Sequence, residues 1–283
     1  MTRGGTRTEC ELNDITVHYE TFGEGRPLLA LHGWGMDHRY MVTDLEPLFG
    51  QRDGWKRIYP DLPGHGMTPG PDWIKDRDQE LDVVLDFVDA VIPGERFVVA
   101  GSSAGAYLAR GVVHRRPAAI DGVLLTVPMI HDRVAERQIP PHVTLVADPA
   151  IVSELTPEEA DGLFPYIVVQ DRRVLDYYRA NVPSAETGDE AYMERIQEGP
   201  GTYSFSFDVD ALPEPCPAPT LIVTGRQDSV IGYRDAWGIL ENYPRATFAV
   251  LDRSGHFMGV EQADLFHALV DEWLDRVEEY APV

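Results

Sequence analysis

Residues 97–105 read FVVAGSSAG, a run of apolar and small residues that ends in Gly-Ser-Ser-Ala-Gly. The letters FVVA are typical of a buried strand, and the residues from Ala104 onward are typical of a helix that Pro117 ends. Gly-x-Ser-x-Gly between a strand and a helix is typical of a sharp turn that exposes the hydroxyl of its central serine. That serine is Ser103, whereas Ser102 is expected to turn its hydroxyl into the protein.

A serine hydroxyl is a poor nucleophile until a base takes its proton. The base and the carboxylate that orients it are expected after later strands, in the order serine, acid, histidine. Asp228 follows the strand-like stretch TLIVTG, and His256 follows the next one, TFAVLD. The sequence therefore predicts a catalytic triad of Ser103, His256 and Asp228. Asp132, which follows an earlier strand, is the alternative acid.

Backbone N–H groups beside Ser103 are also required, because negative charge develops on the carbonyl oxygen of the substrate. The N–H of Ala104 lies at the start of the expected helix, where amides have no helical partner. A second donor is expected in HGWG, after the strand-like stretch RPLLAL, and Trp34 is the simplest choice. Gly101 and Gly105 suit the turn because side chains there would meet the neighbouring strand and helix. We expect Trp34 and Ala104 to form the oxyanion hole.

Strand-like and helix-like stretches alternate through most of the chain. A hairpin is expected over 9–20, followed by strands within 26–33, 55–66, 97–100, 120–128, 220–225 and 247–252. Helices are expected over 37–49, 74–92, 104–116, 233–243 and 261–279. Continuous Val, Ile and Leu runs that alternate with helices predict an α/β fold with a mainly parallel sheet, covered by helices on both faces.

Residues 129–213 interrupt this alternation with many prolines, helical patches and aromatic side chains. A segment this long between two strands is too long for a plain loop. We expect a mostly helical cap, or lid, at 129–213, inserted into a core domain formed by 1–128 and 214–283. Most of its aromatic residues are expected to form the cap's own small core, with some lining a substrate cavity: Phe164, Tyr166, Tyr177, Tyr178, Tyr192, Tyr203, Phe205 and Phe207.

Composition excludes several classes of function. The 283 residues carry a formal net charge of −23, so the surface repels phosphate backbones and anionic membranes. We therefore expect neither a nucleic-acid nor a membrane partner. The acidic residues are spread along helices, which favours a well-solvated surface over an adaptation to a salt-rich habitat.

Targeting and cofactor signals are weak or missing. The N-terminal stretch MTRGGTRTECELND has no apolar segment of a secretory signal, and no apolar run approaches the length of a membrane-spanning helix, so a cytoplasmic location is expected. Cys10 and Cys216 are far apart and have no metal-like spacing, so two free thiols are expected. No cofactor or metal is expected.

The motifs LHGWG, DLPGHG, GSSAG, GRQD and SGHF occur in the order and with the spacing of the α/β-hydrolase superfamily. The chain resembles its serine-nucleophile branch with an inserted cap, over roughly 9–128 and 214–280. The resemblance implies a mainly parallel eight-stranded sheet with the cap after the sixth strand. It also carries over the site residues predicted above: Ser103, Asp228, His256, Trp34 and Ala104. Haloalkane dehalogenases and epoxide hydrolases of this superfamily have aspartate at the position of Ser103, so those activities are not expected.

The leading hypothesis is a carboxylesterase-like serine hydrolase that cleaves an ester or related acyl bond of a small molecule through an acyl-enzyme. Lactonase, thioesterase, amidase and C–C bond hydrolase activities remain alternatives on the same scaffold, because the fold does not determine the substrate. A cofactor-free perhydrolase or lyase is a further alternative. The alternative of a different class is a non-catalytic small-molecule receptor with a hydrolase-like pocket.

Overall fold

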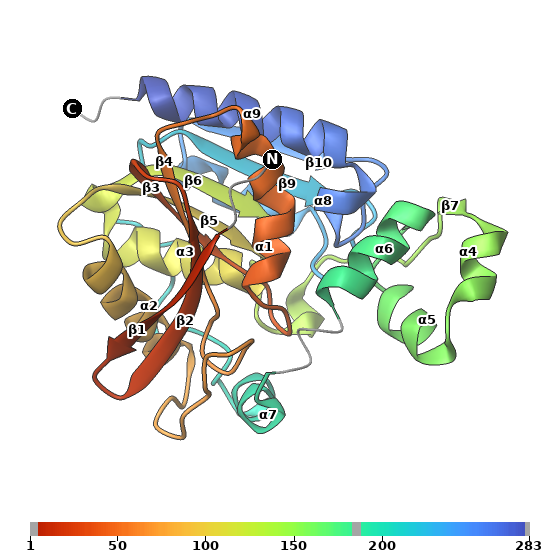
Figure 1. The fold of residues 1–283 in the computed structure, drawn as a ribbon, viewed down its shortest axis with the longest axis horizontal. Helices are drawn as coiled ribbons and strands as arrows, with labels where there is room; N and C mark the ends of the chain where they lie inside the picture. Colours follow the sequence, from red (N-terminus) through yellow and green to blue (C-terminus); the bar gives the residue numbers. More distant parts are fainter. Residues whose placement is uncertain (1–4, 183–187, 281–283) are drawn as a thin grey trace.

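One eight-stranded sheet forms the centre of the computed structural model, which describes residues 5–182 and 188–280. Its strand order is β1-β2-β4-β3-β5-β6-β9-β10 (Figure 1). The β1–β2 and β2–β4 pairs are antiparallel and the others are parallel. The strands are β1 (Thr6–Leu12), β2 (Ile15–Phe22), β3 (Arg26–Leu31), β4 (Trp55–Pro60), β5 (Phe97–Ser102), β6 (Ile120–Thr126), β9 (Thr220–Gly225) and β10 (Ala246–Leu251). The predicted mainly parallel sheet of eight strands is confirmed.

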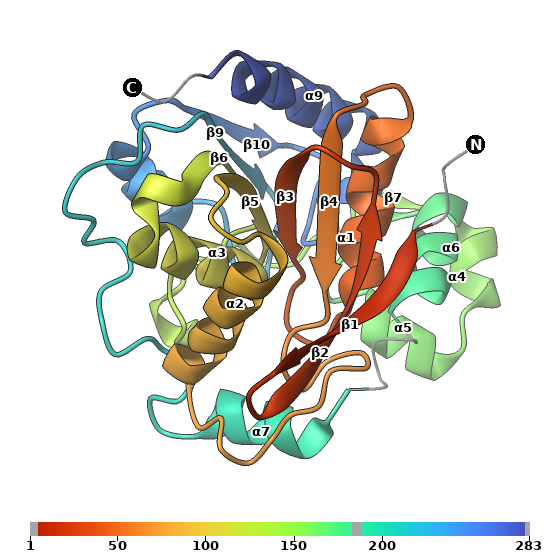
Figure 2. The same cartoon turned by 60° about the vertical axis from the view of Figure 1, so that its left-hand side comes forward.

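Helices cover both faces of the sheet. In Figure 2, α2 and α3 lie on one side, and α1 and α9 on the other. The helices outside the segment between β6 and β9 are α1 (His38–Leu45), α2 (Arg77–Val91), α3 (Ala104–Arg115), α8 (Met258–Glu261) and α9 (Ala263–Glu279). The helix expected over 233–243 is instead a 3₁₀ helix, Asp235–Asn242, with Gly238 in its middle, a residue that disfavours a regular α-helix. Within the described residues, no helix has the length and apolar character that crossing a membrane requires.

The two faces of the sheet bury two separate hydrophobic clusters because side chains alternate along each strand. In β3, Leu29 and Leu31 pack with the α2 and α3 side, whereas Leu28 and Ala30 pack with the α1 and α9 side. All four side chains are at most 1% exposed. Helix α2 begins at Arg77, three residues later than expected, because the Asp76 side chain caps it by accepting from the N–H of Gln79.

The residues between β6 and β9 form two parts. The first contains β7 (Val146–Ala147), α4 (Pro149–Glu154), α5 (Pro157–Leu163), β8 (Val169–Gln170) and α6 (Arg172–Asn181), with a hydrophobic cluster of its own. We call residues 146–182 the α4–α6 lobe, which lies to the right of the sheet in Figure 1. The second part holds α7 (Glu190–Glu198) and residues 199–213, which pack against the α2 and α3 side of the main core.

This division changes the expectation for the aromatic residues of the segment. Phe164, Tyr177 and Tyr178 join the cluster of the α4–α6 lobe, as predicted. The other group does not form a core of the segment, because it packs into the cluster of the main sheet: Tyr192, Tyr203, Phe205 and Phe207. Residues 199–213 lead back along α2 and α3 before β9 begins, so the nearest apolar surface is that of the main sheet. Both cysteines are free thiols.

Candidate active site

The turn between β5 and α3 has the geometry that the glycine-serine pattern predicts. Ser103 has φ 54° and ψ −116°, and within the described residues it and Val127 are the two non-glycine residues with positive φ. Such a conformation is strained for serine and persists where neighbouring backbone fixes it. A Cβ on Gly101 would lie 2.4 Å from the carbonyl oxygen of Gly105, and one on Gly105 would lie 2.3 Å from that of Leu31. The close approach of strand and helix thus excludes side chains at both glycines.

A chain of polar contacts joins Ser103 to His256 and Asp228. The Nε2 of His256 lies 3.2 Å from the Ser103 Oγ, and its Nδ1 lies 2.9 Å from the Asp228 Oδ2. Asp228 is fully buried, and its Oδ1 accepts from the backbone N–H groups of Val230 and Ile231 at 2.8 and 3.0 Å. Those two bonds fix the carboxylate so that its second oxygen faces the imidazole. The three residues come from loops at the carboxyl ends of β5, β9 and β10.

The two alternatives raised by the sequence lie elsewhere in the hydrogen-bond network. The carboxylate of Asp132 accepts from the Ser204 hydroxyl, and the carboxylate that lies next to His256 is that of Asp228. Ser102 is 1% exposed, and its hydroxyl donates to the Tyr40 hydroxyl at 3.3 Å. The geometry therefore brings Ser103, His256 and Asp228 together and leaves Asp132 and Ser102 outside that chain.

Two backbone N–H groups close to Ser103 in the fold lack a hydrogen-bond partner in the part of the chain that the structure describes. Ala104 is the first residue of α3, where amides have no partner within the helix. Trp34 follows Gly33, whose Cβ would lie 3.4 Å from the Ser103 Cβ. Within residues 5–182 and 188–280, neither the Trp34 N–H nor the Ala104 N–H has a hydrogen-bond partner. Both therefore remain candidates for the donors of an oxyanion hole.

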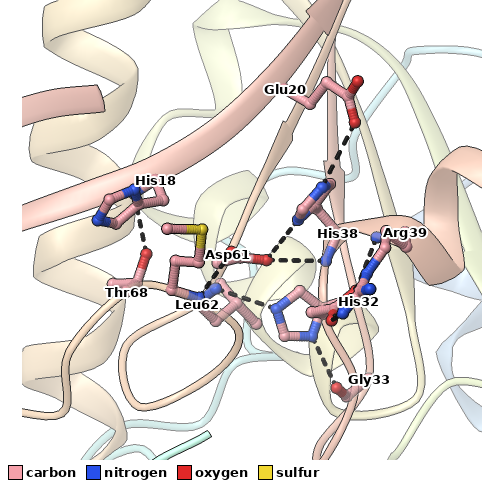
Figure 3. A network of polar contacts seen from close by, with 11 residues as sticks. His18, Glu20, His32, Gly33, His38, Arg39, Asp61, Leu62 and Thr68 are labelled. Atoms are coloured by element: carbon pink, nitrogen blue, oxygen red, sulfur yellow. Dashed lines mark hydrogen bonds and ion pairs between the residues drawn. The ribbon is translucent and has the colours of Figure 1, made fainter. Parts of the chain in front are cut away.

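His32 fixes the loop that carries Trp34. Its Nε2 accepts from the Leu62 N–H at 3.0 Å, so the proton is on Nδ1, which donates to the Gly33 carbonyl at 2.8 Å. Complete burial lowers the pKa of His32, which keeps the ring neutral and this pair of hydrogen bonds intact. Figure 3 shows the ring between the two backbone groups.

The indole of Trp34 is held on several sides. Its Nε1 donates to the Gln197 side chain at 3.1 Å, and the rings of His65 and Tyr203 meet it edge-on with centroids 4.8 and 5.0 Å away. The guanidinium of Arg77 lies 4.6 Å from the Trp34 ring centroid and 4.3 Å from that of Tyr203. These contacts order the backbone next to Ser103, because the ring cannot move without breaking them.

A cavity of about 1140 Å³ opens at the Ser103 hydroxyl. Core residues on its wall include Trp34, Ser103 and His256. The segment between β6 and β9 contributes more of the wall, including Met129, Arg137, Tyr166, Gln197 and Tyr203. Of the eight aromatic residues considered above, Tyr166 and Tyr203 are the ones that line the cavity. The cavity therefore lies between the sheet and this segment.

A second histidine–carboxylate cluster, Asp37, His38 and Asp61, has ligand atoms close enough to hold a metal. Protein donors already occupy it (Figure 3). Asp61 accepts from His38 Nδ1, the His38 N–H and the Met67 N–H at 2.7, 2.9 and 3.0 Å. Asp37 accepts from the backbone and the guanidinium of Arg39. With its carboxylates already bonded, the cluster has the character of a structural network rather than of a metal site.

Three residues around the site were not identified from the sequence: His32, Arg77 and Glu261. His32 directly precedes Gly33 in the motif HGWG, so its place in that motif was a usable signal. Arg77 and Glu261 lie on helices, where charged residues are ordinary, and both are buried. No pattern in the sequence distinguishes these two buried residues from the solvent-exposed charged residues of other helices.

Comparisons with known proteins agree with this architecture. A model of the alpha/beta hydrolase family matches residues 28–269. The pimeloyl-[acyl-carrier protein] methyl ester esterase of Legionella pneumophila (strain Corby) is 25% identical over 267 residues, which cover 92% of this chain and 100% of the relative. The 2-hydroxy-6-oxo-6-(2'-aminophenyl)hexa-2,4-dienoic acid hydrolase of Metapseudomonas resinovorans is 21% identical over 275 residues, or 93% of this chain and 88% of the relative.

Solved structures share the fold. An alpha/beta superfamily hydrolase from Oenococcus oeni PSU-1 matches with a TM-score of 0.84 at 24% identity, over 93% of this chain and 96% of that protein. The family model covers most of the sheet, the Ser103 turn and the loops of Asp228 and His256. This chain belongs to the alpha/beta hydrolase family.

Proposed function

We propose that this protein is a serine hydrolase that cleaves the carboxylic ester of a small molecule. The observation that carries the proposal is the chain of contacts from Asp228 through His256 to Ser103, which ends in a large cavity. A partly buried hydroxyl within reach of a histidine, itself oriented by a buried carboxylate, is the arrangement that activates a serine. A relative named as a methyl ester esterase supports an ester as the substrate.

The proposed reaction begins when His256 Nε2 takes the Ser103 proton as the Oγ attacks the ester carbonyl carbon. The N–H groups of Trp34 and Ala104 stabilise the negative oxygen of the tetrahedral intermediate. Each such donor lowers the activation free energy by about 3 kcal/mol. His256 then gives its proton to the departing alcohol, which leaves an acyl group on Ser103. A water molecule, deprotonated by His256, releases the acid. Asp228 holds the Nδ1 proton and stabilises the imidazolium.

The substrate is expected to be a small molecule held between the sheet and the segment at 129–213, which we propose acts as the cap. A cavity of about 1140 Å³ lies slightly above the usual range for small-molecule pockets, so the ester can carry a sizeable acyl or alcohol group. Residues of the cap that line the cavity, such as Tyr166 and Tyr203, are placed to select among these groups. Their replacement is expected to change the preference for chain length.

Two neighbouring serines provide the test. Turnover of p-nitrophenyl esters from acetate to octanoate is measured for the wild-type protein, Ser103→Ala and Ser102→Ala, together with labelling by a fluorophosphonate. We expect Ser103→Ala to lose at least about 10⁴-fold in kcat and all labelling. Ser102→Ala is the matched control and is expected to stay within about tenfold of the wild type, because its hydroxyl faces Tyr40 and not His256.

The outcomes separate the proposal from its rival. A wild-type protein that neither hydrolyses an activated ester nor accepts the label contradicts the proposal and favours a non-catalytic receptor. Label that persists in Ser103→Ala contradicts the assignment of the nucleophile.

A further inference from the structure

The buried carboxylate of Glu261, at the end of α8, binds three backbone N–H groups. Glu261 is 3% exposed. Its Oε1 accepts from the N–H groups of Val168 and Val169 at 2.6 and 3.2 Å. Its Oε2 accepts from the Gly255 N–H at 2.7 Å. One side chain therefore bonds the α4–α6 lobe on one side and, on the other, the loop directly before His256.

The same stretch of the lobe, residues 165–169, makes two more contacts with the loops of the triad. The His256 N–H donates to the Tyr166 carbonyl at 2.9 Å. The hydroxyl of Ser229, next to Asp228, donates to the Pro165 carbonyl at 3.2 Å. The loops of Asp228 and His256 thus both donate hydrogen bonds to residues 165–169, which lie outside the main sheet. Glu261 adds further hydrogen bonds between the same residues and the His256 loop.

The residues that follow His256 also make hydrophobic contacts with the α4–α6 lobe. Val260, the neighbour of Glu261, is buried in the cluster of the α4–α6 lobe, and Phe257 packs against the same cluster. Helix α8 begins one residue after Phe257, so the segment that follows His256 is anchored in the lobe and not only in the sheet. Apolar contacts as well as hydrogen bonds therefore join the lobe to the segment around His256.

We infer that Glu261 is a positioning residue that fixes the His256 loop against residues 165–169 of the cap and so couples the cap to the catalytic base. The inference rests on the proposed function, because it assigns Glu261 a role in orienting a base. It concerns the orientation of His256, since Glu261 is not among the residues that line the cavity and its carboxylate bonds backbone N–H groups rather than Ser103.

A carboxylate suits this place because it only accepts hydrogen bonds, and all three surrounding groups are donors. An amide in its position can accept with one end, but its NH₂ then faces a backbone N–H at the other. Burial raises the pKa of Glu261 to about 7, although the three backbone N–H groups act against this, so the carboxylate that accepts all three bonds is the main form above that pH. Replacing the oxygen near Gly255 is thus expected to release the His256 loop.

The test compares Glu261→Gln with Glu46→Gln. Glu46 is a second buried carboxylate, 7% exposed, that accepts from Arg57 and Tyr59 and contacts no residue of the proposed triad. We measure the rate of fluorophosphonate labelling, kcat and KM for p-nitrophenyl acetate, and the melting temperature. Both variants are expected to melt earlier than the wild type. Only Glu261→Gln is expected to label and turn over about 10- to 100-fold more slowly, with KM within about threefold, because a misplaced base affects the chemical step.

Equal labelling rates for Glu261→Gln and the wild type overturn the inference and leave Glu261 with a purely structural role. A wild-type protein that takes no label overturns the proposed function instead, so the two failures are distinguishable. Should Glu261→Gln fail to fold, Gly255→Ala tests the same link without a change of charge. A Cβ there would lie 2.6 Å from the Tyr166 carbonyl oxygen, so labelling is expected to slow, and unchanged labelling contradicts the inference.

Discussion

Two histidine–aspartate pairs in this protein are nearly identical in their contact and different in their surroundings. His256 Nδ1 lies 2.9 Å from Asp228, and His38 Nδ1 lies 2.7 Å from Asp61. Both carboxylates are at most 1% exposed. The second ring nitrogen of His256 faces Ser103 at the cavity, whereas that of His38 is buried and faces Glu20 at 3.4 Å. A histidine–aspartate contact alone therefore does not define a catalytic base. The two histidines differ in the group that faces the second ring nitrogen and in whether that nitrogen lies at the cavity.

The surroundings of His38 also affect its charge. Burial opposes a positive charge on His38, but the hydrogen bond to Asp61 and the charges of Asp61, Asp37 and Glu20 outweigh it and raise the pKa of His38. The pKa of Asp61 is lowered, although its own burial acts in the opposite direction, because His38 bonds and neutralises it. Both shifts favour the charged forms of His38 and Asp61, whose contact binds the start of α1 to the loop after β4.

Among changes to the two histidine–aspartate pairs, Asp228→Asn is expected to have the largest effect. An amide can donate to His256 Nδ1 and so favour the wrong tautomer, which leaves Nε2 protonated and unable to take the Ser103 proton. We expect kcat for p-nitrophenyl acetate to fall about 10³- to 10⁴-fold, with a melting temperature within a few degrees of the wild type. Kinetics and thermal unfolding of the same preparation check this. An activity loss of less than tenfold contradicts the assignment of Asp228.

Asp61→Asn is expected to show the opposite pattern, with a loss of stability and little loss of activity. Removing the carboxylate leaves buried His38 without its counter-charge and weakens the bonds to two backbone N–H groups, which costs about 3 kcal/mol. Urea unfolding measures that loss, and fluorophosphonate labelling is expected to remain within about threefold.

The pH dependence follows from the two pKa shifts. The ionised form of Asp61 stabilises the fold above its ordinary pKa and loses that effect as the pH falls through its lowered pKa. The charged form of His38 stabilises below its ordinary pKa of 6.5 and loses that effect as the pH rises through its raised pKa. The difference between the wild type and Asp61→Asn is expected to be largest near about pH 5 to 6. A difference that grows steadily up to pH 9 contradicts the ion pair.

These two pairs also show why the sequence predicts some features and not others. Asp228 and His256 were recognisable because each follows a strand, and parallel strands bring their carboxyl ends together. The same rule placed Ser103 and Gly33 side by side. The alternation of buried strands and amphipathic helices likewise sufficed to predict a mainly parallel sheet covered by helices on both faces, because the pattern has a fixed period.

The features that the sequence did not reveal depend on long-range contacts, which leave no regular spacing in the sequence. Tyr192 and Phe205 join the cluster of the main sheet because α7 and the residues after it pack against that cluster, whereas composition alone assigned both to the cap's own core. Glu261 receives its partners from residues 168, 169 and 255, which no local pattern connects. The burial of Glu261 depends on how residues 168–169, residue 255 and α8 pack together, which only the three-dimensional structure shows.

Asp44 is another buried carboxylate, and it differs from both pairs because its side chain bonds a tyrosine instead of a histidine. Its Oδ1 accepts from the hydroxyl of Tyr177 on α6 at 3.0 Å, and within the described residues no cationic side chain lies within ion-pair distance of it. Burial raises its pKa from 3.8 to about 7, although the bond from Tyr177 acts against this. Asp44 thus contacts the α4–α6 lobe at the expense of stability whenever it is ionised.

Asp44→Asn is expected to have the smallest effect and the opposite sign, because it keeps an acceptor for Tyr177 and removes the buried charge. Below about pH 4 the carboxyl is neutral in both the folded and the unfolded chain, so the variant gains nothing there. Between about pH 4 and 7 only the unfolded chain ionises, and the wild type loses stability that the variant keeps. A pKa rise from 3.8 to about 7 corresponds to at most about 4 kcal/mol, and we expect a gain of about 2 kcal/mol at pH 8, because a neutral amide bonds Tyr177 more weakly. Urea unfolding of both proteins at pH 4 and pH 8 measures it, and a variant that is less stable than the wild type at pH 8 contradicts an unpaired charge at Asp44.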